Sequence, residues 1–293
     1  MRKIDLSVII LSYNTKNLLE KCLRSITQQL ISDTEVIVFD NASTDGSPQM
    51  VREKFPNVKL IVNKENLGFS KGNNKAVQKA SGELVLFLNS DTVVKERTIE
   101  KLVDSIKKNE EKAAVCPLLL NGDGTIQKDP CYLRFPSPLM SLFYYNNILR
   151  KLVSNFFPQL LYSTSNFSTP SEVDQLPGAA FVIRKSDFLN IGGFDESFSH
   201  FFEDVDLSWR LREKGFKFFL IPEAEVVHFG RKSLEPKIKK EGVESFYYLN
   251  FKSLFKFCEK HYSPKTVFLV KAVIFLFFLG RLRFGLINKL FCQ

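Results

Sequence analysis

Short apolar runs alternate along the first part of the chain with longer stretches in which apolar residues recur at helical spacing. The runs are rich in valine, isoleucine and leucine and are bounded by turn residues, as expected of strands covered on both faces. This alternation predicts βαβ units, and therefore an α/β fold with a mainly parallel sheet flanked by helices. The predicted strands are Leu6–Leu11, Glu35–Phe39, Val58–Val62, Leu84–Leu88 and Ala113–Leu118, and the predicted helices are Lys16–Gln28, Ser47–Lys54, Lys71–Lys79 and Glu96–Lys108.

The pattern changes after the fifth strand. Residues 121–170 are rich in proline and aromatic residues, which indicates an insertion rather than another βαβ unit. Strand-like runs return at Gly178–Arg184, Phe216–Ile221 and Glu225–Phe229, with a helix expected near Asp204–Lys214. We therefore expect one domain over residues 1–230, made of segments 1–118, 121–170 and 171–230, followed by a basic and apolar helical extension over 231–293.

Polar side chains follow each of the first four predicted strands. In an open parallel sheet, ligands bind at these carboxyl ends, near the point where the strand order reverses. Each residue alone is as readily an ordinary turn residue, but four strand ends in register favour a binding site. The residues are Ser12, Tyr13 and Asn14 after the first strand, Asp40 and Asn41 after the second, Asn63 and Asn66 after the third, and Asn89, Ser90 and Asp91 after the fourth.

The stretch Glu65–Asn74 places glycines and amides before and inside a predicted helix start. No Gly-x-Gly-x-x-Gly follows the first strand and no P-loop motif occurs, so neither a dinucleotide site nor a P-loop is supported. Donors between Asn66 and Asn73, Gly68 included, are suited to phosphate or ribose oxygens at the positive end of a helix. The alternative is an ordinary glycine-rich loop.

Asp91 ends an apolar strand, where burial makes an unpaired carboxylate costly. A divalent cation, Mg²⁺ or Mn²⁺, that bridges Asp91 to a diphosphate would satisfy it and neutralise a leaving group. Structural capping is the alternative. His228 ends a later strand and is a candidate ligand of the same metal or a phosphate donor, although a lone histidine is as readily structural.

Three carboxylates cluster at Glu203, Asp204 and Asp206, beside the only tryptophan of the chain, Trp209. Acids at a helix start interact favourably with the helix dipole, which accounts for one of them. Like charges at this spacing raise at least one pKa, which suits a general base that takes a proton from a hydroxyl group.

The composition and net charge indicate what kind of partner the protein binds. Of the 293 residues, 44% are hydrophobic and 25% charged, as in globular proteins, and the net charge of +9 indicates an anionic partner. No basic stripe interleaved with aromatic residues occurs, so we expect no nucleic-acid binding. Residues 1–230 hold 28 basic and 28 acidic residues, whereas residues 231–293 hold 13 and 4, so the excess charge favours anionic lipid.

The apolar segment Thr266–Gly280 has 15 residues. A helix of that length measures about 22 Å, against a hydrocarbon core of about 30 Å. We expect an interfacial helix on an anionic membrane surface; a buried C-terminal helix or an oligomer contact is the alternative. Five scattered cysteines and the lack of a signal-peptide cleavage site favour a cytoplasmic protein attached peripherally to the inner face of the cell membrane.

Seven motifs together resemble inverting glycosyltransferase family two, which has the GT-A fold, and within it the rhamnosyltransferase-like branch. The resemblance covers roughly residues 4–230 and implies a Rossmann-like sheet, with residues 1–118 as the nucleotide-sugar half and 171–230 as the acceptor and catalytic half. The motifs are Val8–Asn14, Phe39–Ser47, Asn66–Phe69, Asn89–Asp91, Pro177–Ala180, Gly192–Asp195 and Glu203–Arg210.

The resemblance also implies roles for individual residues. Asp204 matches the catalytic base, with Glu203 supporting the acceptor site or the metal. Asp91 matches the last acid of the metal-binding Asp-x-Asp, whose first acid is replaced here by Asn89. The positions that match the donor site are Ser12, Tyr13, Asn14, Asp40, Asn66, Gly68, Asn73, Asn89 and Ser90.

The implied reaction is a single displacement, with inversion, at the anomeric carbon of a nucleotide diphosphate sugar. The branch favours dTDP-rhamnose as the donor and a UDP-sugar next, with Mg²⁺ or Mn²⁺ as cofactor. The acceptor would be a saccharide, lipid-linked, in cell-surface polysaccharide synthesis, and Tyr132–Tyr162 is a candidate wall of its site or a plain variable loop. The alternative function is a non-catalytic nucleotide-sugar or glycan-binding protein of the same fold.

Overall fold

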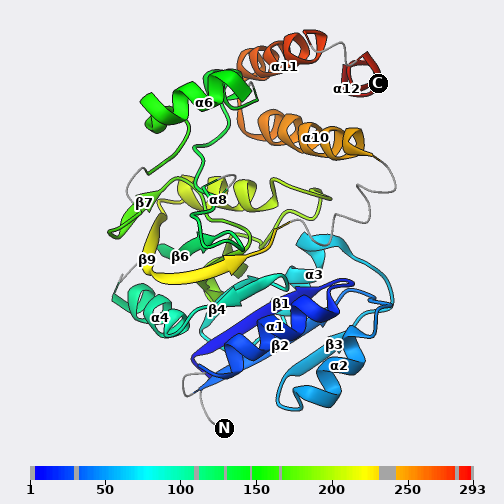
Figure 1. Cartoon of the computed structure of the whole chain (residues 1–293), viewed down its shortest axis with the longest axis vertical. Helices are drawn as coiled ribbons and strands as arrows, with labels where there is room; N and C mark the ends of the chain where they lie inside the picture. The colour runs from blue at the N-terminus through cyan, green and yellow to red at the C-terminus, as the bar shows by residue number, and fades with distance from the viewer. Residues whose placement is uncertain are drawn as a thin grey trace.

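The computed structural model describes residues 4–29, 33–108, 112–128, 131–145, 147–164, 167–230, 242–280 and 284–291. One large mixed sheet, flanked by helices, occupies most of the molecule, and the C-terminal helices gather at one end of it (Figure 1). The predicted α/β architecture is confirmed.

The first half of the sheet is parallel. Its central strand pairs with the second and the fourth strands of the chain, and the third pairs with the outer edge of the second. The first and fourth strands are almost wholly buried, because helices cover the sheet. These four strands agree with the predicted ones to within one residue at each end. The elements are β1 (Leu6–Ser12), α1 (Lys16–Thr27), β2 (Thr34–Asp40), α2 (Ser47–Lys54), β3 (Lys59–Val62), α3 (Gly68–Val77) and β4 (Leu84–Asn89).

The second half of the sheet mixes directions. Strand β8 (Ala180–Arg184) lies antiparallel between β4 and β6 (Ala113–Leu120), and β6 pairs in parallel with β9 (Lys217–His228). The short strands β5 (Thr92–Val94) and β7 (Ser171–Val173) pair antiparallel with β9. The resulting order is β3-β2-β1-β4-β8-β6-β9-β5, with β7 also on β9. Helices α4 (Thr98–Lys108), α7 (Lys185–Asn190) and α8 (Glu203–Glu213) connect these strands.

One strand differs from the expectation. The predicted strands Phe216–Ile221 and Glu225–Phe229 form the single strand β9, because its pairing with β6 resumes after an irregularity. Ile221 lies opposite Pro117, and Glu225 lies opposite the next residue, Leu118. Prolines are tolerated in sheets at such bulges. The sequence pattern also misses β5 and β7, since three residues are too few to show an alternation.

The segment between β6 and β7 forms helices α5 (Pro138–Tyr145) and α6 (Asn147–Phe156) and the 3-10 turn η1 (Pro158–Leu160). A small core of its own holds this segment together, consisting of Leu133, Met140, Val153, Leu161 and Tyr162. Helix α5 also contacts α11, so the inserted segment reaches the C-terminal helices.

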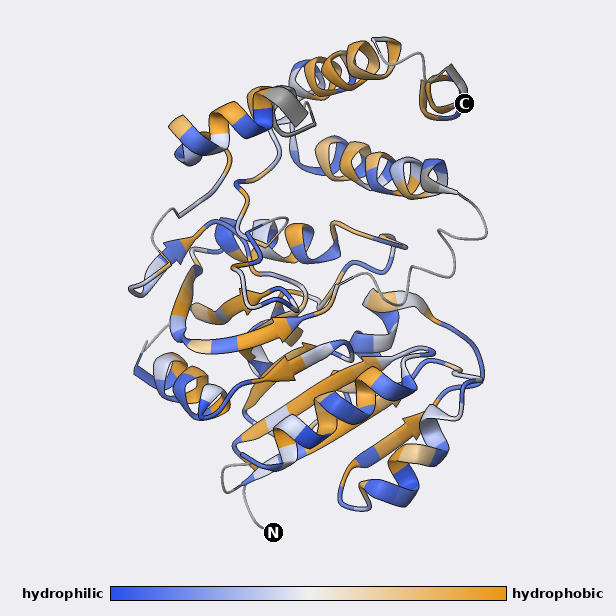
Figure 2. Ribbon diagram, viewed as in Figure 1, coloured by the Kyte–Doolittle hydropathy of each residue, from blue (hydrophilic) through white to orange (hydrophobic). Residues whose placement is uncertain are grey.

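The C-terminal helices are α10 (Val243–His261), α11 (Pro264–Leu279) and α12 (Phe284–Phe291), and the predicted boundary at residue 231 lies outside the described residues. They share a second hydrophobic core with Phe198 from the sheet domain. Helix α11 is apolar along most of its length (Figure 2) and buries Val270, Ile274 and Phe278. Within the part of the chain that the structure describes, no helix has both the length and the apolar character needed to cross a membrane.

A buried carboxylate fastens α10 to α8. Asp206 Oδ1 accepts hydrogen bonds from Lys260 Nζ and His261 Nε2, both at 2.7 Å, and Oδ2 accepts one from Arg210 Nε at 2.8 Å. Burial raises the pKa of Asp206, but the hydrogen bonds from His261 and Lys260 and the charge of Arg210 outweigh burial, and the pKa is lowered. Asp206 is therefore an ionised, fully paired anchor for the C-terminal helices.

Candidate active site

One cavity of about 1640 Å³ extends from the strand ends of the sheet to the C-terminal helices. Its polar side comes from the loops that follow β1 to β4, two acids at the start of α8 form a second group, and its apolar side comes from α5, α10 and α11. The polar side includes Tyr13, Asn14, Asn41, Asn66, Asn89, Ser90 and Asp91, the acids are Glu203 and Asp204, and the apolar side includes Met140, Phe246, Tyr247, Phe277 and Phe278.

The first two strand ends lie side by side, as predicted. Ser12 is the register partner of Asp40 in the pairing of β1 with β2. Tyr13 and Asn14 line the cavity, and Asn14 adopts a φ of 53° while its backbone amide donates to Ser43 Oγ at 2.9 Å. Ser12 and Asp40 are buried and lie outside the residues that line the cavity. The structure thus brings all four residues together but exposes only two of them.

Asn41, one of the polar residues predicted to gather at the strand ends, shapes the glycine-containing loop. Its side-chain nitrogen donates to Asn66 Oδ1 at 2.8 Å, and its Oδ1 accepts from the Leu67 amide at 2.8 Å. Asn66 Oδ1 also accepts from the Gly68 amide at 2.9 Å. These bonds hold Asn66 and Gly68 at the cavity wall, so Asn41 acts on the site by fixing this loop.

Asn73 points elsewhere. It lies in the second turn of α3, is only 3% exposed, and donates to the Phe69 carbonyl of its own helix at 3.1 Å. It does not belong to the residues that line the cavity. Of the residues predicted on this stretch, the structure therefore places Asn66 and Gly68, but not Asn73, at the cavity.

Asn89, Asp91 and His228 lie together because β5 pairs with β9, which sets Thr92 opposite His228. His228 Nε2 lies 3.4 Å from Asp91 Oδ1 and 3.4 Å from Asn89 Nδ2. Ser90 also lines the cavity, and its Oγ accepts from Thr15 Oγ1 at 2.9 Å.

The pair of Asp91 and His228 fits a divalent cation whose remaining ligands come from a substrate. Neighbouring ligands at about 2.1 Å from an octahedral ion are about 3 Å apart, close to the 3.4 Å between Asp91 Oδ1 and His228 Nε2. No group of three or more histidine, cysteine, aspartate or glutamate side chains that could hold a metal occurs among the described residues. A metal here would therefore depend on oxygens of a bound diphosphate.

Asp204 is held in place by the backbone. Its Oδ2 accepts from the Gly178 amide at 2.8 Å, and its Oδ1 accepts from the Val205 amide at 2.9 Å. Burial raises the pKa of the Asp204 carboxyl, although these two amides act in the opposite direction. A β-carbon on Gly178 would lie 2.8 Å from Asp204 Oδ2, so only glycine allows this close approach.

Glu203 differs from its neighbour. Its Oε2 is buried without a hydrogen-bond partner in the described structure. Burial, and next the charge of Asp204, raise the pKa of Glu203 to about 8. The expectation that crowded acids raise a pKa agrees with this direction, but burial is the larger cause. Burial therefore favours the protonated form of Glu203.

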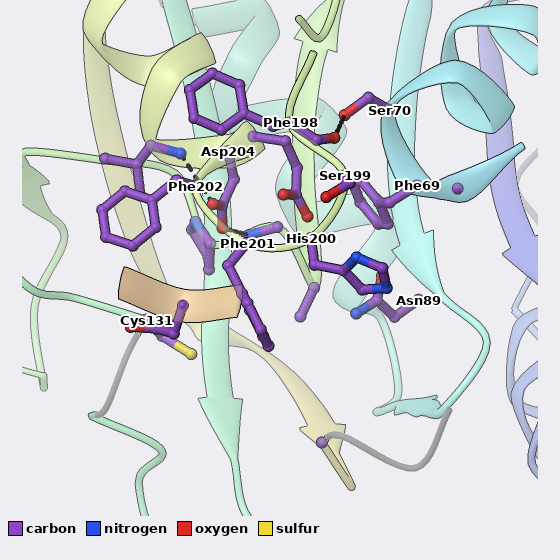
Figure 3. Close-up of a pocket in the computed structure, with 18 of the residues that line it drawn as sticks. Phe69, Ser70, Asn89, Cys131, Phe198, Ser199, His200, Phe201, Phe202 and Asp204 are labelled. Carbon is purple, nitrogen blue, oxygen red and sulfur yellow. Dashed lines mark hydrogen bonds between the residues drawn. The ribbon is translucent and has the colours of Figure 1, made fainter. Parts of the chain in front are cut away.

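The turn before these acids is strained. Phe201 and Phe202 have φ values of 62° and 67°, a left-handed conformation that costs about 1 to 2 kcal/mol for each residue that is not glycine. Helix α10 holds the turn, since Ser253 Oγ donates to the His200 carbonyl at 2.6 Å and the ring of Phe246 packs edge-on against Phe201. In Figure 3 Phe201 lies between Asp204 and Asn89, and both phenylalanines of the turn line the cavity.

Family models match most of the sheet domain. Residues 7–188 match the model of glycosyl transferase family 2, and residues 158–232 match a model described as the N-terminal domain of galactosyltransferase.

Two curated proteins illustrate the similarity. The N-acetylglucosaminyl-diphospho-decaprenol L-rhamnosyltransferase of Mycobacterium tuberculosis is 29% identical over 240 residues, which cover 76% of this chain and 75% of the relative. The low-salt glycan biosynthesis hexosyltransferase Agl10 of Haloferax volcanii is 25% identical over 257 residues, which cover 86% of this chain and 74% of the relative.

Solved structures share the fold. The mannosyltransferase PcManGT from Pyrobaculum calidifontis, in complex with GDP-Man and Mn²⁺, superposes with a TM-score of 0.57 at 19% identity, over 93% of this chain and 69% of that one. S. aureus TarS in complex with UDP-GlcNAc superposes with a TM-score of 0.52 at 19% identity, over 76% of this chain and 58% of that one.

Replacing Glu203 by glutamine will flatten the pH dependence of stability. The folded protein holds the Glu203 proton up to about pH 8, whereas an unfolded chain releases it near the usual value of 4.5. The folded state binds more protons between these values, so the free energy of unfolding falls as the pH rises through this window. Glu203→Gln removes that contribution, which chemical denaturation at several pH values measures.

The matched control for this prediction is Glu223→Gln, which changes an exposed glutamate. The control should keep the slope of the unmodified protein. Parallel stability curves for Glu203→Gln and the unmodified protein would show that Glu203 is ionised in the fold.

Proposed function

Because the chain belongs to glycosyltransferase family 2, whose model matches residues 7–188, we propose that it is an inverting, metal-dependent enzyme that transfers rhamnose from dTDP-rhamnose to a lipid-linked saccharide. A UDP-sugar is the second donor candidate. The transfer would serve cell-surface polysaccharide synthesis at the inner face of the cell membrane.

The observation that carries this proposal is the shared cavity of Asp204 and the pair of Asp91 and His228. A transferase that inverts needs a base on the acceptor side and a group that receives the charge of the leaving diphosphate. Asp204 is fixed by backbone amides on one side of the cavity, and the candidate metal pair lies on the other, at the strand ends.

The chemistry then follows from the residues. Asp204 takes the proton of the acceptor hydroxyl, and the oxygen forms a bond to the anomeric carbon as the bond to the nucleoside diphosphate breaks. Attack opposite the leaving group inverts the configuration. Asp91 and His228 would hold a divalent cation, which supplies charge neutralisation at the diphosphate. In its protonated form, which burial favours, Glu203 would add no second negative charge beside the base.

Support for the donor comes from the relatives. The Mycobacterium tuberculosis relative is named a rhamnosyltransferase, and solved structures of the same fold contain GDP-Man with Mn²⁺ or UDP-GlcNAc. Asn14, Asn66 and Gly68 line the polar side of the cavity, where a nucleotide would meet amide donors and the start of α3.

An exposed apolar surface supports the proposal of a lipid-linked acceptor. Of the thirteen large hydrophobic side chains that are exposed in the described structure, ten lie within 139–160 and 268–279. We call these ten the apolar end surface, and α5 joins its two parts by contacting both α6 and α11. Its members are Leu139, Leu152, Phe156, Phe157, Leu160, Phe268, Leu269, Phe275, Leu276 and Leu279.

Charge favours lipid over a second copy of the chain as the partner of this surface. The exposed Lys151, Lys265 and Lys289 lie on α6, α11 and α12, and residues 231–293 carry the whole net charge of +9. Lysines beside an apolar face suit anionic headgroups above acyl chains. On their inner side α10 and α11 line the cavity through Tyr247 and Phe278, so a lipid-borne acceptor would reach the base from this end.

Replacing Asp204 by asparagine will abolish most of the transfer and leave donor binding intact. Asparagine has nearly the same shape as aspartate and can still accept the hydrogen bond from the Gly178 amide, but it cannot take up a proton. General base action contributes about 10² to 10⁴ in rate, and we expect a loss of that order in dTDP-rhamnose turnover. Thermal shift with dTDP-rhamnose and Mn²⁺ checks binding, with Asp104→Asn, an exposed aspartate on α4, as control. Full turnover by Asp204→Asn would exclude Asp204 as the base. If no dTDP- or UDP-sugar raises the melting temperature of the protein, the donor assignment is wrong.

Gly178→Ala will lower turnover although it replaces no ionisable group. The new methyl group would lie 2.8 Å from Asp204 Oδ2, so the carboxylate must move. We expect at least about a tenfold loss of turnover, within the range that base catalysis contributes, with an unchanged KM for the donor. Gly280→Ala is the control, because a methyl group there meets nothing closer than 3.4 Å. Equal turnover by the two variants would contradict this role of Gly178.

Leu276→Glu will weaken binding to anionic vesicles. The unmodified protein should sediment with phosphatidylglycerol vesicles and less with phosphatidylcholine vesicles. Leu276 is 64% exposed on α11, and loss of one buried leucine costs about 1.5 to 3 kcal/mol, or tenfold or more in affinity.

Leu189→Glu is the matched control for the vesicle experiment, since Leu189 is a 46% exposed leucine on α7, outside the apolar end surface. It should bind vesicles like the unmodified protein. Equal losses in both variants, or self-association without vesicle binding, would contradict the membrane assignment.

A further inference from the structure

Gln127, which follows β6 in the inserted segment, faces the ring of His228. Its Oε1 lies 2.7 Å from His228 Nδ1. Its side-chain nitrogen donates to the His228 backbone carbonyl at 3.2 Å and to Asn121 Oδ1 at 3.0 Å. A backbone carbonyl can only accept, so it fixes which end of the Gln127 amide is the nitrogen, and the oxygen must face the ring.

This orientation determines the tautomer of His228. An amide oxygen also only accepts, so Nδ1 carries the hydrogen, and the neutral ring then has its lone pair on Nε2. Nε2 faces the Asn89 amide nitrogen and Asp91 Oδ1, each at 3.4 Å. The lone pair of His228 Nε2 and the Oδ1 atom of Asp91 therefore face each other at a separation that a bound cation would bridge.

The turn that carries Gln127 is fixed by its own hydrogen bonds. The backbone amide of Gln127 donates to the backbone carbonyl of Leu119 at 2.8 Å. Asn121 Nδ2 donates to Thr125 Oγ1 at 2.9 Å, and Thr125 Oγ1 donates to Asp123 Oδ1 at 2.7 Å. Because Asn121 is held in this way, its Oδ1 supplies a second fixed acceptor for the side-chain nitrogen of Gln127.

We infer that Gln127 is a positioning residue: it holds His228 in the form protonated at Nδ1, so that Nε2 and Asp91 together present a preformed pair of ligands for a divalent cation. The cation rests on the proposed function, whereas the tautomer is a property of the protein alone. The segment between β6 and α5, which also lines the cavity, thereby contributes a residue that orients a metal ligand. Partners that orient metal-bound histidines in this way typically change metal affinity by 10- to 100-fold.

The first readout is the tautomer itself. The chain has three histidines, so ¹⁵N-imidazole NMR of the protein without ligands, at alkaline pH where imidazoles are neutral, can be assigned with His228→Asn. We expect His228 in the Nδ1-protonated form in the unmodified protein. Gln127→Leu should shift it towards the Nε2-protonated form, and Gln127→Glu, which keeps an acceptor oxygen, should retain the original form.

The second readout is Mn²⁺ binding, measured by electron paramagnetic resonance of free Mn²⁺ in the presence of UDP. We expect Gln127→Leu to weaken Mn²⁺ binding about 10- to 100-fold and Gln127→Glu to restore it. Gln29→Leu is the control, since Gln29 also donates to backbone carbonyls, of Ser25 and Val94, but lies away from the cavity. It should change neither readout, and thermal denaturation verifies that each variant is folded.

Two results would overturn the inference: an Nε2-protonated His228 in the unmodified protein, or a Gln127→Leu variant that binds Mn²⁺ as tightly as Gln29→Leu. Failure of sugar transfer with an intact tautomer shift and an intact Mn²⁺ response would count against the proposed reaction only. The two proposals are therefore tested separately.

Discussion

A buried carboxylate that must stay paired decides how the sheet and the C-terminal helices fit together. An ion removed from water costs several kcal/mol unless close partners replace its hydration, and Asp206 is completely buried. Its partners Lys260 and His261 belong to α10, so α10 has to lie against α8 for the charge to be satisfied. Because Asp204 lies one half-turn before Asp206 on the same helix, the contact that fixes α10 also fixes Asp204, the proposed base.

The docking of α10 gives the cavity two chemically different sides. The sheet contributes amides and an acid at the strand ends, as parallel sheets do in general, whereas the C-terminal helices contribute aromatic rings. The strained turn Phe201–Phe202 connects the sides, and its unfavourable backbone conformation persists because α10 holds it through Ser253 and Phe246. The acids with raised pKa values lie where the two sides meet, since burial there disfavours their charge.

The strands and the location of the site follow from the sequence because both depend on local regularities. Buried parallel strands are short apolar runs, and their carboxyl ends converge, which places Tyr13, Asn14 and Asp91 at one cavity. The direction of a side chain depends on packing, and so Asn73 turned out to bond to its own helix. Partners far apart in the chain leave no periodic signal: Gln127 and His228 are 101 residues apart, and Asp206 and His261 are 55 apart.

The single tryptophan stands at the junction of three segments. The ring of Trp209, on the helix that carries Glu203 and Asp204, contacts Phe135 from the inserted segment at 4.9 Å between centroids and Tyr262, after α10, at 5.2 Å. Its other aromatic neighbours, Phe257 and His261, lie on α10. All tryptophan emission of the protein therefore originates at one place where these segments meet. Their separation or rearrangement changes the surroundings of that ring, so the molecule carries a built-in optical reporter of its own assembly.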